Sequence, residues 1–533
     1  MKIIKYLSLA LILIIGVSQC KLPDNIDPKH PTEVPYYTLF SNGLDNMVRQ
    51  TESTSVNNNI QRLTVQFWQE TTYFDESRYN YQDRQIPDGF ASRYYKDALM
   101  DFQEAKKILT DENYGGDPDV TLNEIAIIDI CEVYCYQIIV DVWGDMPYTF
   151  ALQGPDNTAP AYDGAAAIYT DLIKRLRNDL ASLNSSSGAF AGKDMMYNGD
   201  AAAWKRFGAS LLLRVGMRLS DVDAASAKSA VADAVAAGVF TAQSESAFLF
   251  YPGVVPHVNE INDAFRQGRK DFLPTHTLIN MMSAKEDPRM NLCFKPITFS
   301  YDTDENGDKI PTTLEPQVEG LPQQTILMYA DGNVKVDLPF TAELADTLNL
   351  FDYHWGAIAG LDGAQSYNNY SNFSDRTMDA AFEGNMMDFV EVEFLLAEAA
   401  QRGFGGAAEE HYNAAITASI LYWWGSDADA AAYLAANPYD AANWKQSIGE
   451  QKWLALYNHG VEAFSEWRRL DYPILNPPEG MTYSDIPLRM PYPYNEVLEN
   501  TANYEATVER WLPNGDVTST PVFWDVVASP AAK

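Results

Sequence analysis

The sequence predicts a mostly α-helical protein, with helices toward both ends and an irregular, loop-rich portion between them. Apolar residues recur at three- and four-residue steps from 94 to 238 and again from 388 to 470. Between 248 and 385 these periods fade, while Pro, Gly, Asn and Tyr become frequent. The chain has 533 residues, of which 46% are hydrophobic, enough for one sizeable core.

Residues 1–19 have the pattern of a secretion signal. Lys2 and Lys5 precede a short apolar stretch from Tyr6 to Val17. This stretch is too short to cross a bilayer as a helix, but it has the length of a signal-peptide core.

Cys20 follows at the position where a lipoprotein signal has its acylated cysteine, although Gln19 is unusual just before it. We therefore expect a lipid-anchored mature chain that begins at Cys20. Residues 20–35, rich in Pro and Asp, are expected to form a polar tether. The alternative is ordinary secretion with Cys20 as a free thiol.

The first half of the chain is expected to hold a series of paired helices. The pairs are similar to degenerate tetratricopeptide repeats, and residues 68–81 should form an ordered loop with short helical pieces. The expected helices are 36–49, 94–110, 121–143, 165–183, 200–220 and 223–238.

The loop-rich portion should contain a hairpin at 299–310, turning at Asn306-Gly307. After it, regular helices resume, and Gly460 predicts a break within the stretch 448–473. Residues 487–504 are expected to be an extended Pro/Tyr-rich segment lying on the body. The expected helices are 275–283, 341–348, 388–402, 407–424, 428–436 and the helix or helix pair at 448–473.

The charge of the chain excludes one class of partner. With 73 acidic and 38 basic residues, the formal net charge is −35. So acidic a chain repels phosphate backbones, which argues against nucleic acid as a partner.

Cys131 and Cys135 lie four residues apart in an apolar run, as two small buried side chains would. A metal site there would need further ligands nearby, and no His is close in sequence.

The sequence holds no familiar catalytic motif. HExxH, GxSxG and a Gly-rich phosphate loop are all absent, and the six His are scattered. Among 73 acids, no pair for glycoside cleavage can be singled out. Asp302, Asp304 and Asn306 resemble the start of a calcium loop, but Thr313 stands where its glutamate should be. A polar hairpin is the better interpretation, so we expect neither a metal nor a cofactor.

Two stretches, 68–81 and 355–370, combine aromatic rings with Asn, Arg and Asp. Flat rings suit the apolar face of a sugar, and polar side chains suit its hydroxyl edge. The alternative is that the rings are simply buried. The expected ligand contacts are Trp68, Tyr73, Tyr79, Asn80, Tyr81, Trp355, Tyr367, Asn368 and Tyr370.

Motifs spread over nearly the whole chain resemble those of the SusD/RagB family of nutrient-binding outer-membrane lipoproteins. The strongest is QKWLALYNHGVEAFSEWRRLDYP at 451–473. The others are WGDMPY at 143–148, WKRFGASLLLRVGMRLS at 204–220, DPR at 287–289, EFLLAEAAQRG at 393–403 and the ending at 486–504.

The resemblance implies a right-handed superhelix of about four tetratricopeptide-like helix pairs, within a single body at 36–533. It implies a protein that is lipid-anchored at the surface of the outer membrane, with 248–385 facing the ligand. It also implies delivery of an oligosaccharide or other nutrient to a SusC-like TonB-dependent transporter, without catalysis. A secreted hydrolase acting on the same polymers and a protein-binding helical scaffold remain the alternatives.

Overall fold

The computed structural model describes residues 34–112, 114–266, 268–296, 301–303, 309–311, 325–330, 334–339, 354, 356–361, 367 and 370–526. Predictions for Cys20, Trp355, Asn368, the helix at 341–348 and the calcium-loop residues Asp304 and Asn306 lie outside these residues. Within the described part, no helix has the length and apolar character needed to cross a membrane.

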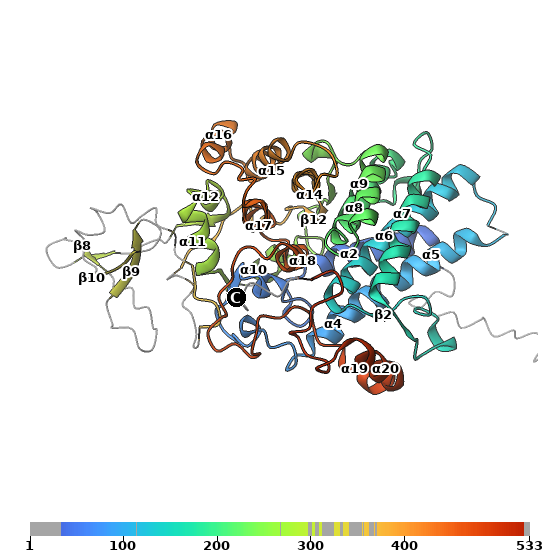
Figure 1. The fold of residues 1–533 in the computed structure, drawn as a ribbon, viewed down its shortest axis with the longest axis horizontal. Helices are drawn as coiled ribbons and strands as arrows, with labels where there is room; N and C mark the ends of the chain where they lie inside the picture. Colours follow the sequence, from blue (N-terminus) through green and yellow to red (C-terminus); the bar gives the residue numbers. More distant parts are fainter. Residues whose placement is uncertain are drawn as a thin grey trace, which may run out of the picture.

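The predicted mostly α-helical class is confirmed, and four successive helix pairs pack within the described chain. In Figure 1, α5 to α9 stand side by side on the right, and α14 to α17 continue the body toward the left. The pairs are α6 (Pro118–Trp143) with α7 (Ala165–Ser182), α8 (Ala201–Arg218) with α9 (Ala224–Ala237), α14 (Phe389–Gln401) with α15 (Ala408–Tyr422), and α17 (Trp444–Ala455) with α18 (Gly460–Leu470).

Local sequence explains where these helices begin and end. Asp117, Asp200 and Asp388 each accept backbone N–H bonds at a helix N-terminus, where unpaired donors gather. Asn458, with φ of +78°, separates α17 from α18 beside the predicted break at Gly460. Helix α6 is buried around its whole circumference from Asn123 onward, which its continuous apolar sequence requires.

The remaining helices lie around these pairs. Helix α2 packs on α5, and a π-helical turn at Arg93–Leu99 joins α4 to α5. The bounds are α2 (Tyr36–Thr51), α3 (Gln61–Thr64), α4 (Ile86–Ser92), α5 (Met100–Thr110), α10 (Glu260–Arg266), α11 (His276–Ala284), α12 (Arg289–Cys293), α16 (Asp427–Ala436), α19 (Tyr494–Glu499) and α20 (Thr501–Trp511).

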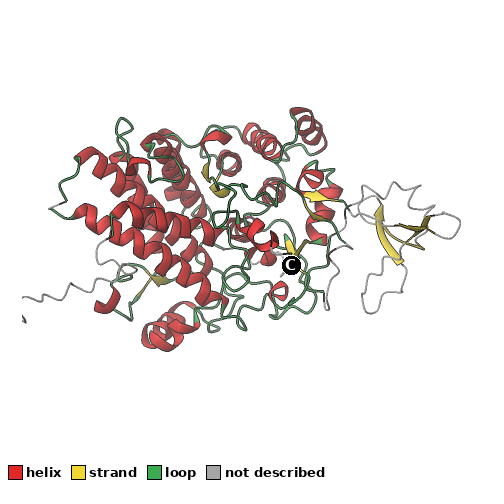
Figure 2. Ribbon diagram, turned by 180° about the vertical axis from the view of Figure 1, so that it is seen from behind, coloured by secondary structure: helices red, strands yellow, loops and turns green. Residues whose placement is uncertain are grey.

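Strands are short, and each described sheet is an antiparallel pair (Figure 2). The predicted hairpin is confirmed in its strands, because Asp302 pairs with Ile310. The pairs are β1 (Trp68–Glu70) with β5 (Phe272–Pro274), β2 (Met146–Pro147) with β3 (Tyr162–Asp163), β4 (Ala247–Leu249) with β12 (Gly384–Met387), β6 (Phe294–Lys295) with β11 (Asn372–Phe373), β7 (Tyr301–Thr303) with β8 (Lys309–Pro311), and β9 (Thr325–Ala330) with β10 (Val334–Pro339).

One local prediction is wrong: the tail predicted as extended at 487–504 contains α19 and the start of α20. The short helices α4, α10 and α12 were not predicted. Helix α19 has six residues and buries none of them, so it carries no apolar period that a sequence pattern could reveal. Pro493 stands at its N-cap, where proline is tolerated, rather than marking a continuous extended segment.

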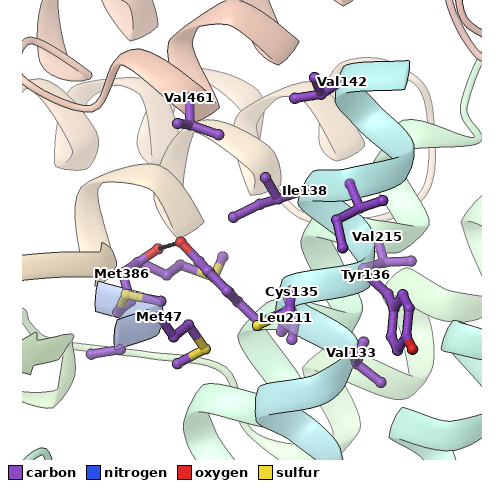
Figure 3. Packing of buried hydrophobic residues seen from close by; sticks show 14 of the residues in the cluster. Met47, Val133, Cys135, Tyr136, Ile138, Val142, Leu211, Val215, Met386 and Val461 are labelled. Atoms are coloured by element: carbon purple, nitrogen blue, oxygen red, sulfur yellow. Dashed lines mark hydrogen bonds between the residues drawn. The ribbon is translucent and has the colours of Figure 1, made fainter. Parts of the chain in front are cut away.

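The two helical blocks share one core, although about 150 residues separate them in the chain. Figure 3 shows Met47 of α2, Cys135 of α6, Leu211 of α8, Met386 of β12 and Val461 of α18 converging on it. Helix α14 also packs on α8, and α18 packs on α6. The interpretation of the cysteines as small buried side chains is confirmed, because Cys131, Cys135 and Cys293 are free and buried.

A network of buried ion pairs crosses the contact between the two blocks. Charged side chains this deep persist only with partners, because leaving water costs each ion several kcal/mol. Helix α8 supplies two arginines, which bind carboxylates of the C-terminal block: the pairs are Arg214–Glu391 and Arg218–Glu462. Arg469–Glu398 and Lys452–Glu466 extend the network within the C-terminal block.

Candidate functional site

The first predicted aromatic stretch begins in β1, which pairs with β5. Trp68 of β1 lies opposite Pro274 of β5 in antiparallel register. The chain after β5 then forms a parallel bridge between Thr275 and Ala357. Three segments that are distant in sequence therefore meet at one edge of the body.

The structure brings the two predicted aromatic stretches together. The N–H of Gly360 donates to Gln69 Oε1 at 2.7 Å, across 291 residues of sequence. Arg78 Nε donates to the carbonyl oxygen of Gly360 at 2.9 Å. Glycine is required at 360, because its φ is +74° and a Cβ there would lie 2.3 Å from the carbonyl oxygen of Glu479.

We use the name loop surface for the exposed and half-buried residues around this contact, which are 72–75, 78, 80, 268–271, 358–359 and Tyr367. Tyr73 is 70% exposed, and Tyr367 is half-buried. The Lys270 ammonium lies 5.0 Å from the Tyr367 ring centroid. The backbone also joins the segments, because Thr71 N–H donates to the carbonyl oxygen of Asp271 at 2.8 Å. The loop surface therefore presents rings beside charged groups.

Asn80 holds the end of this surface in a turn. Its Oδ1 accepts N–H bonds from Gln82 and Asp83 at 3.1 and 3.2 Å. Its Nδ2 donates to Asp83 Oδ2 at 2.8 Å. The side chain is partly exposed but already engaged, so it shapes the surface as well as lining it.

Four of the nine expected contact residues lie in the core instead. Trp68 is 2% exposed and packs against Phe272 and Phe373 at centroid distances of 5.2 and 5.1 Å. A ring enclosed in this way offers no free face to a sugar. The same burial applies to the other three, so for all four the alternative of simply buried rings holds. They are Trp68, Tyr79, Tyr81 and Tyr370.

The buried tyrosines nevertheless support the loop surface. Tyr79 accepts a hydrogen bond from Gln66 Nε2 at 3.1 Å, and the Tyr81 and Thr64 hydroxyls lie 3.1 Å apart. Burial raises the pKa of both phenols, so they stay neutral. Their polar tips are thus satisfied inside the protein.

A pair of carboxyl groups lies under the loop surface. Glu70 and Glu76 are both buried, and the guanidinium of Arg84 binds Glu76. Burial, followed by the neighbouring Glu76, raises the pKa of Glu70 to about 9. Glu70 is therefore neutral at pH 7, and its backbone N–H donates to Ser77 Oγ at 3.1 Å, which ties the loop back on itself.

A separate cavity lies between α5, α6, α7 and the segment after β2. Its volume is about 640 Å³, and its charged lining residues bind one another. Lys106 and Arg175 lie 2.6 and 2.8 Å from Asp129 Oδ1. Although burial opposes it, these two cations and their hydrogen bonds hold the pKa of Asp129 below its usual range. The cavity therefore offers few unsatisfied groups to a ligand.

Among the exposed aromatic residues that sequence reasoning missed is Trp424, at the turn between α15 and α16. Trp424 is 66% exposed there and lies under the guanidinium of Arg376. The run Tyr422-Trp423-Trp424-Gly425 at the end of an expected helix was the available signal.

Within the described ranges, no group of three or more His, Cys, Asp or Glu could hold a metal ion.

Comparisons with known proteins agree with this architecture. The family SusD-like_2, described as "Starch-binding associating with outer membrane", matches residues 28–339 and 336–493. A search of curated proteins finds no significant match.

Solved structures show the same fold. A chitin-binding protein is 23% identical, with a TM-score of 0.72, covering 92% of this chain and 99% of its own. A chitin-binding SusD homolog from Flavobacterium johnsoniae is 22% identical, with a TM-score of 0.69 and the same two coverages. A SusD homolog from Bacteroides uniformis is 21% identical, with a TM-score of 0.69, and the match covers 92% of this chain and 99% of that one. At these identities the likeness establishes the fold alone.

Proposed function

The chain belongs to the SusD-like family, and on this premise we propose that it is a cell-surface lipoprotein that captures an oligosaccharide. It delivers the ligand to a SusC-like TonB-dependent transporter in the outer membrane. Lipid attached to Cys20 holds it at the membrane, and the tether at 20–35 separates the lipid from the body. The family's description and the secretion pattern of the first 19 residues support this proposal.

The observation that carries the proposal is the hydrogen bond between Gln69 and Gly360. It joins two aromatic stretches into one surface, held on a rigid helical body. Loops held in this way are where binding residues collect. The exposed ring of Tyr73 and the half-buried ring of Tyr367 suit the C–H face of a sugar, and Arg78 and Lys270 suit its hydroxyls.

The proposed ligand contacts are narrower than the sequence alone suggested. Tyr73, Asn80 and Tyr367 remain from the nine, together with Trp355 and Asn368 on sequence grounds. The four buried rings act beneath the surface as its support. The net charge of −35 further favours a neutral ligand, since an anionic polymer would be repelled.

A hydrolase of the same polymers is the competing function, and Glu70 with Glu76 is the pair that it would use. Glycosidase carboxyl groups flank the substrate across a cleft, about 5–10 Å apart. Glu70 and Glu76 instead adjoin each other inside the protein, with relative exposures of 4% and 1%. This placement leaves no room for a sugar between them.

Gel retention separates the two functions. The protein is run through native gels that contain soluble starch or glycol chitin, and the same samples are assayed for reducing ends. We expect retardation in at least one gel without release of reducing ends. Release that disappears in Glu70→Gln and Glu76→Gln would overturn the binding-only proposal in favour of hydrolysis.

A further inference from the structure

We propose that Trp424 is a second carbohydrate-stacking platform, which takes one ring of a neutral oligosaccharide. It lies on the α15–α16 turn, at the upper edge of Figure 1, and on different elements from the loop surface. This inference rests on the proposed function, because it assumes that the ligand is a sugar. It adds a site that the aromatic stretches at 68–81 and 355–370 do not contain.

The backbone of the turn holds Trp424 in an uncommon conformation. Helix α15 ends at Tyr422, Trp423 is buried, and Trp424 has φ of +71°. Its N–H donates to the carbonyl oxygen of Leu421 at 3.0 Å. Left-handed backbone favours Gly or Asn and is costly for a bulky residue. A tryptophan that is 66% exposed at such a position needs a reason other than packing.

Arg376 fixes the ring from one side. Its guanidinium carbon lies 4.5 Å from the Trp424 ring centroid and 5.0 Å from that of Tyr422. Arg376 Nη2 donates to Glu383 Oε1 at 3.0 Å, whereas Nε has no hydrogen-bond partner among the described residues. The cation is therefore held by the Glu383 carboxylate and by ring faces. Trp424 is thus covered by the guanidinium on one face while most of its surface stays in solvent.

Aromatic contacts extend this platform along the surface. The Phe248 ring stacks on Tyr422 at 5.9 Å, and Phe250 meets Phe248 edge-on at 6.2 Å. Phe250 is 67% exposed. Trp424 and Phe250 are the exposed ends of this series of aromatic contacts.

The charges around Trp424 indicate the class of ligand. Asp375, Asp379, Asp427 and Asp429 are exposed on the segments that carry Arg376 and Trp424. Asp375 binds Lys295, and Asp429 binds Ser426 at the start of α16. These carboxylates suit hydroxyl donors and repel uronates or sulfated sugars. A rigid indole face beside acceptors therefore fits a neutral pyranose ring, whose axial C–H groups lie on the ring and whose hydroxyls point outward.

Fluorine NMR tests this directly on the full chain in detergent. The protein is labelled with 5-fluorotryptophan, and the Trp424 resonance is identified by its loss in Trp424→Phe. Maltohexaose and chitohexaose are the probes. We expect the Trp424 resonance to shift with one of them, also in a Tyr73→Ala background, where the loop surface has lost its exposed ring.

Binding measurements supply the second readout. Trp424→Ala is expected to weaken affinity for the effective probe on the order of tenfold, without a change in melting temperature. Trp511→Ala is the matched control: Trp511 is 46% exposed, and Arg510 lies 5.7 Å from its ring. It should bind as the unchanged protein does.

Each other outcome overturns the inference in a recognisable way. If the unchanged protein binds no probe and no starch or chitin gel, the proposed function falls together with this site. If it binds while the Trp424 resonance stays fixed and Trp424→Ala keeps full affinity, only this site falls. If Trp424→Ala keeps sugar affinity but no longer co-isolates with the transporter, the platform contacts protein instead of sugar.

Discussion

Arg218 Nη2 lies 2.7 Å from both carboxylate oxygens of Glu462, and this contact joins α8 to α18 across 244 residues of sequence. Both side chains are buried. Asp141 and Glu466 bind the same guanidinium, so one cation gathers three acidic residues from two helices. Their charges raise the pKa of Arg218 although burial opposes this. Arg218 is therefore the centre of the contact between the two helical blocks.

Removing one charge from this contact should destabilise the protein strongly. Glu462→Gln is expected to lower the free energy of unfolding by roughly 3–5 kcal/mol, because it leaves Arg218 buried and undercompensated. Asp233→Asn is the control, since the Arg177–Asp233 pair is about half exposed and should be worth less than about 1 kcal/mol. Urea unfolding of both variants measures the difference. Equal stability of the two would contradict the role given to the buried network.

The N-terminal helical block should not fold alone. A fragment of residues 20–238 keeps Arg214 and Arg218 but loses the partners Glu391, Glu462 and Glu466. We expect circular dichroism to show helix content without a cooperative thermal transition. A monomeric fragment that melts cooperatively would show that the block needs no partner.

Trp68 and Tyr73, five residues apart, should respond in opposite ways to removal of the ring. Trp68→Ala is expected to cost roughly 3–5 kcal/mol of stability, because it empties a packed site between aromatic neighbours. Tyr73→Ala should leave melting nearly unchanged and weaken ligand binding by about 1–3 kcal/mol. Calorimetric melting and titration with the bound oligosaccharide check both. Unchanged affinity in Tyr73→Ala would remove that ring from the site.

Glu70 should make stability depend on pH. Its pKa is about 9 in the folded protein and near 4.5 in the unfolded chain, so the folded state holds the proton. The contribution is fully present below about pH 4.5 and is lost as the pH rises toward 9. Gln resembles the neutral form, so Glu70→Gln should gain stability relative to the unchanged protein as the pH rises.

Melting temperatures of Glu70→Gln and the unchanged protein, measured at about pH 5, 7 and 9, test this pH dependence. Glu104→Gln serves as the control, because Glu104 is an exposed partner of Lys107. Its melting curve should follow that of the unchanged protein at each pH. A Glu70→Gln curve parallel to the control would contradict a proton held on Glu70.

Cys20 should determine whether the protein is anchored in the membrane. Cys20→Ala removes the only acylation site that the sequence pattern offers, so the protein is expected to leave the membrane fraction. Cell fractionation with immunoblotting measures this, and Cys131→Ala, a change in the core, should keep the membrane position. Retention of Cys20→Ala at the membrane would exclude lipid on this residue as the anchor.

The sequence by itself determined the helical class, most helix positions and the family. Helices such as α6 and α8 were found because an amphipathic or continuously apolar period is a local property of ten or more residues. Helix α19 was missed because six residues, none of them buried, leave no such period. The motifs at 451–473 and elsewhere were recognisable for a similar reason, since each is a short continuous string.

Only the tertiary structure decided which aromatic residues reach solvent and which charges are buried. Trp68 and Tyr73 share one polar, aromatic stretch, yet β5 and Phe373 enclose the first and leave the second exposed. From sequence alone, Arg469 at the end of α18 is expected to be solvated. In the structure it is buried and forms an ion pair with Glu398 of α14. Burial depends on contacts with segments that are distant in the sequence, and a local sequence pattern does not show which segments will pack against it.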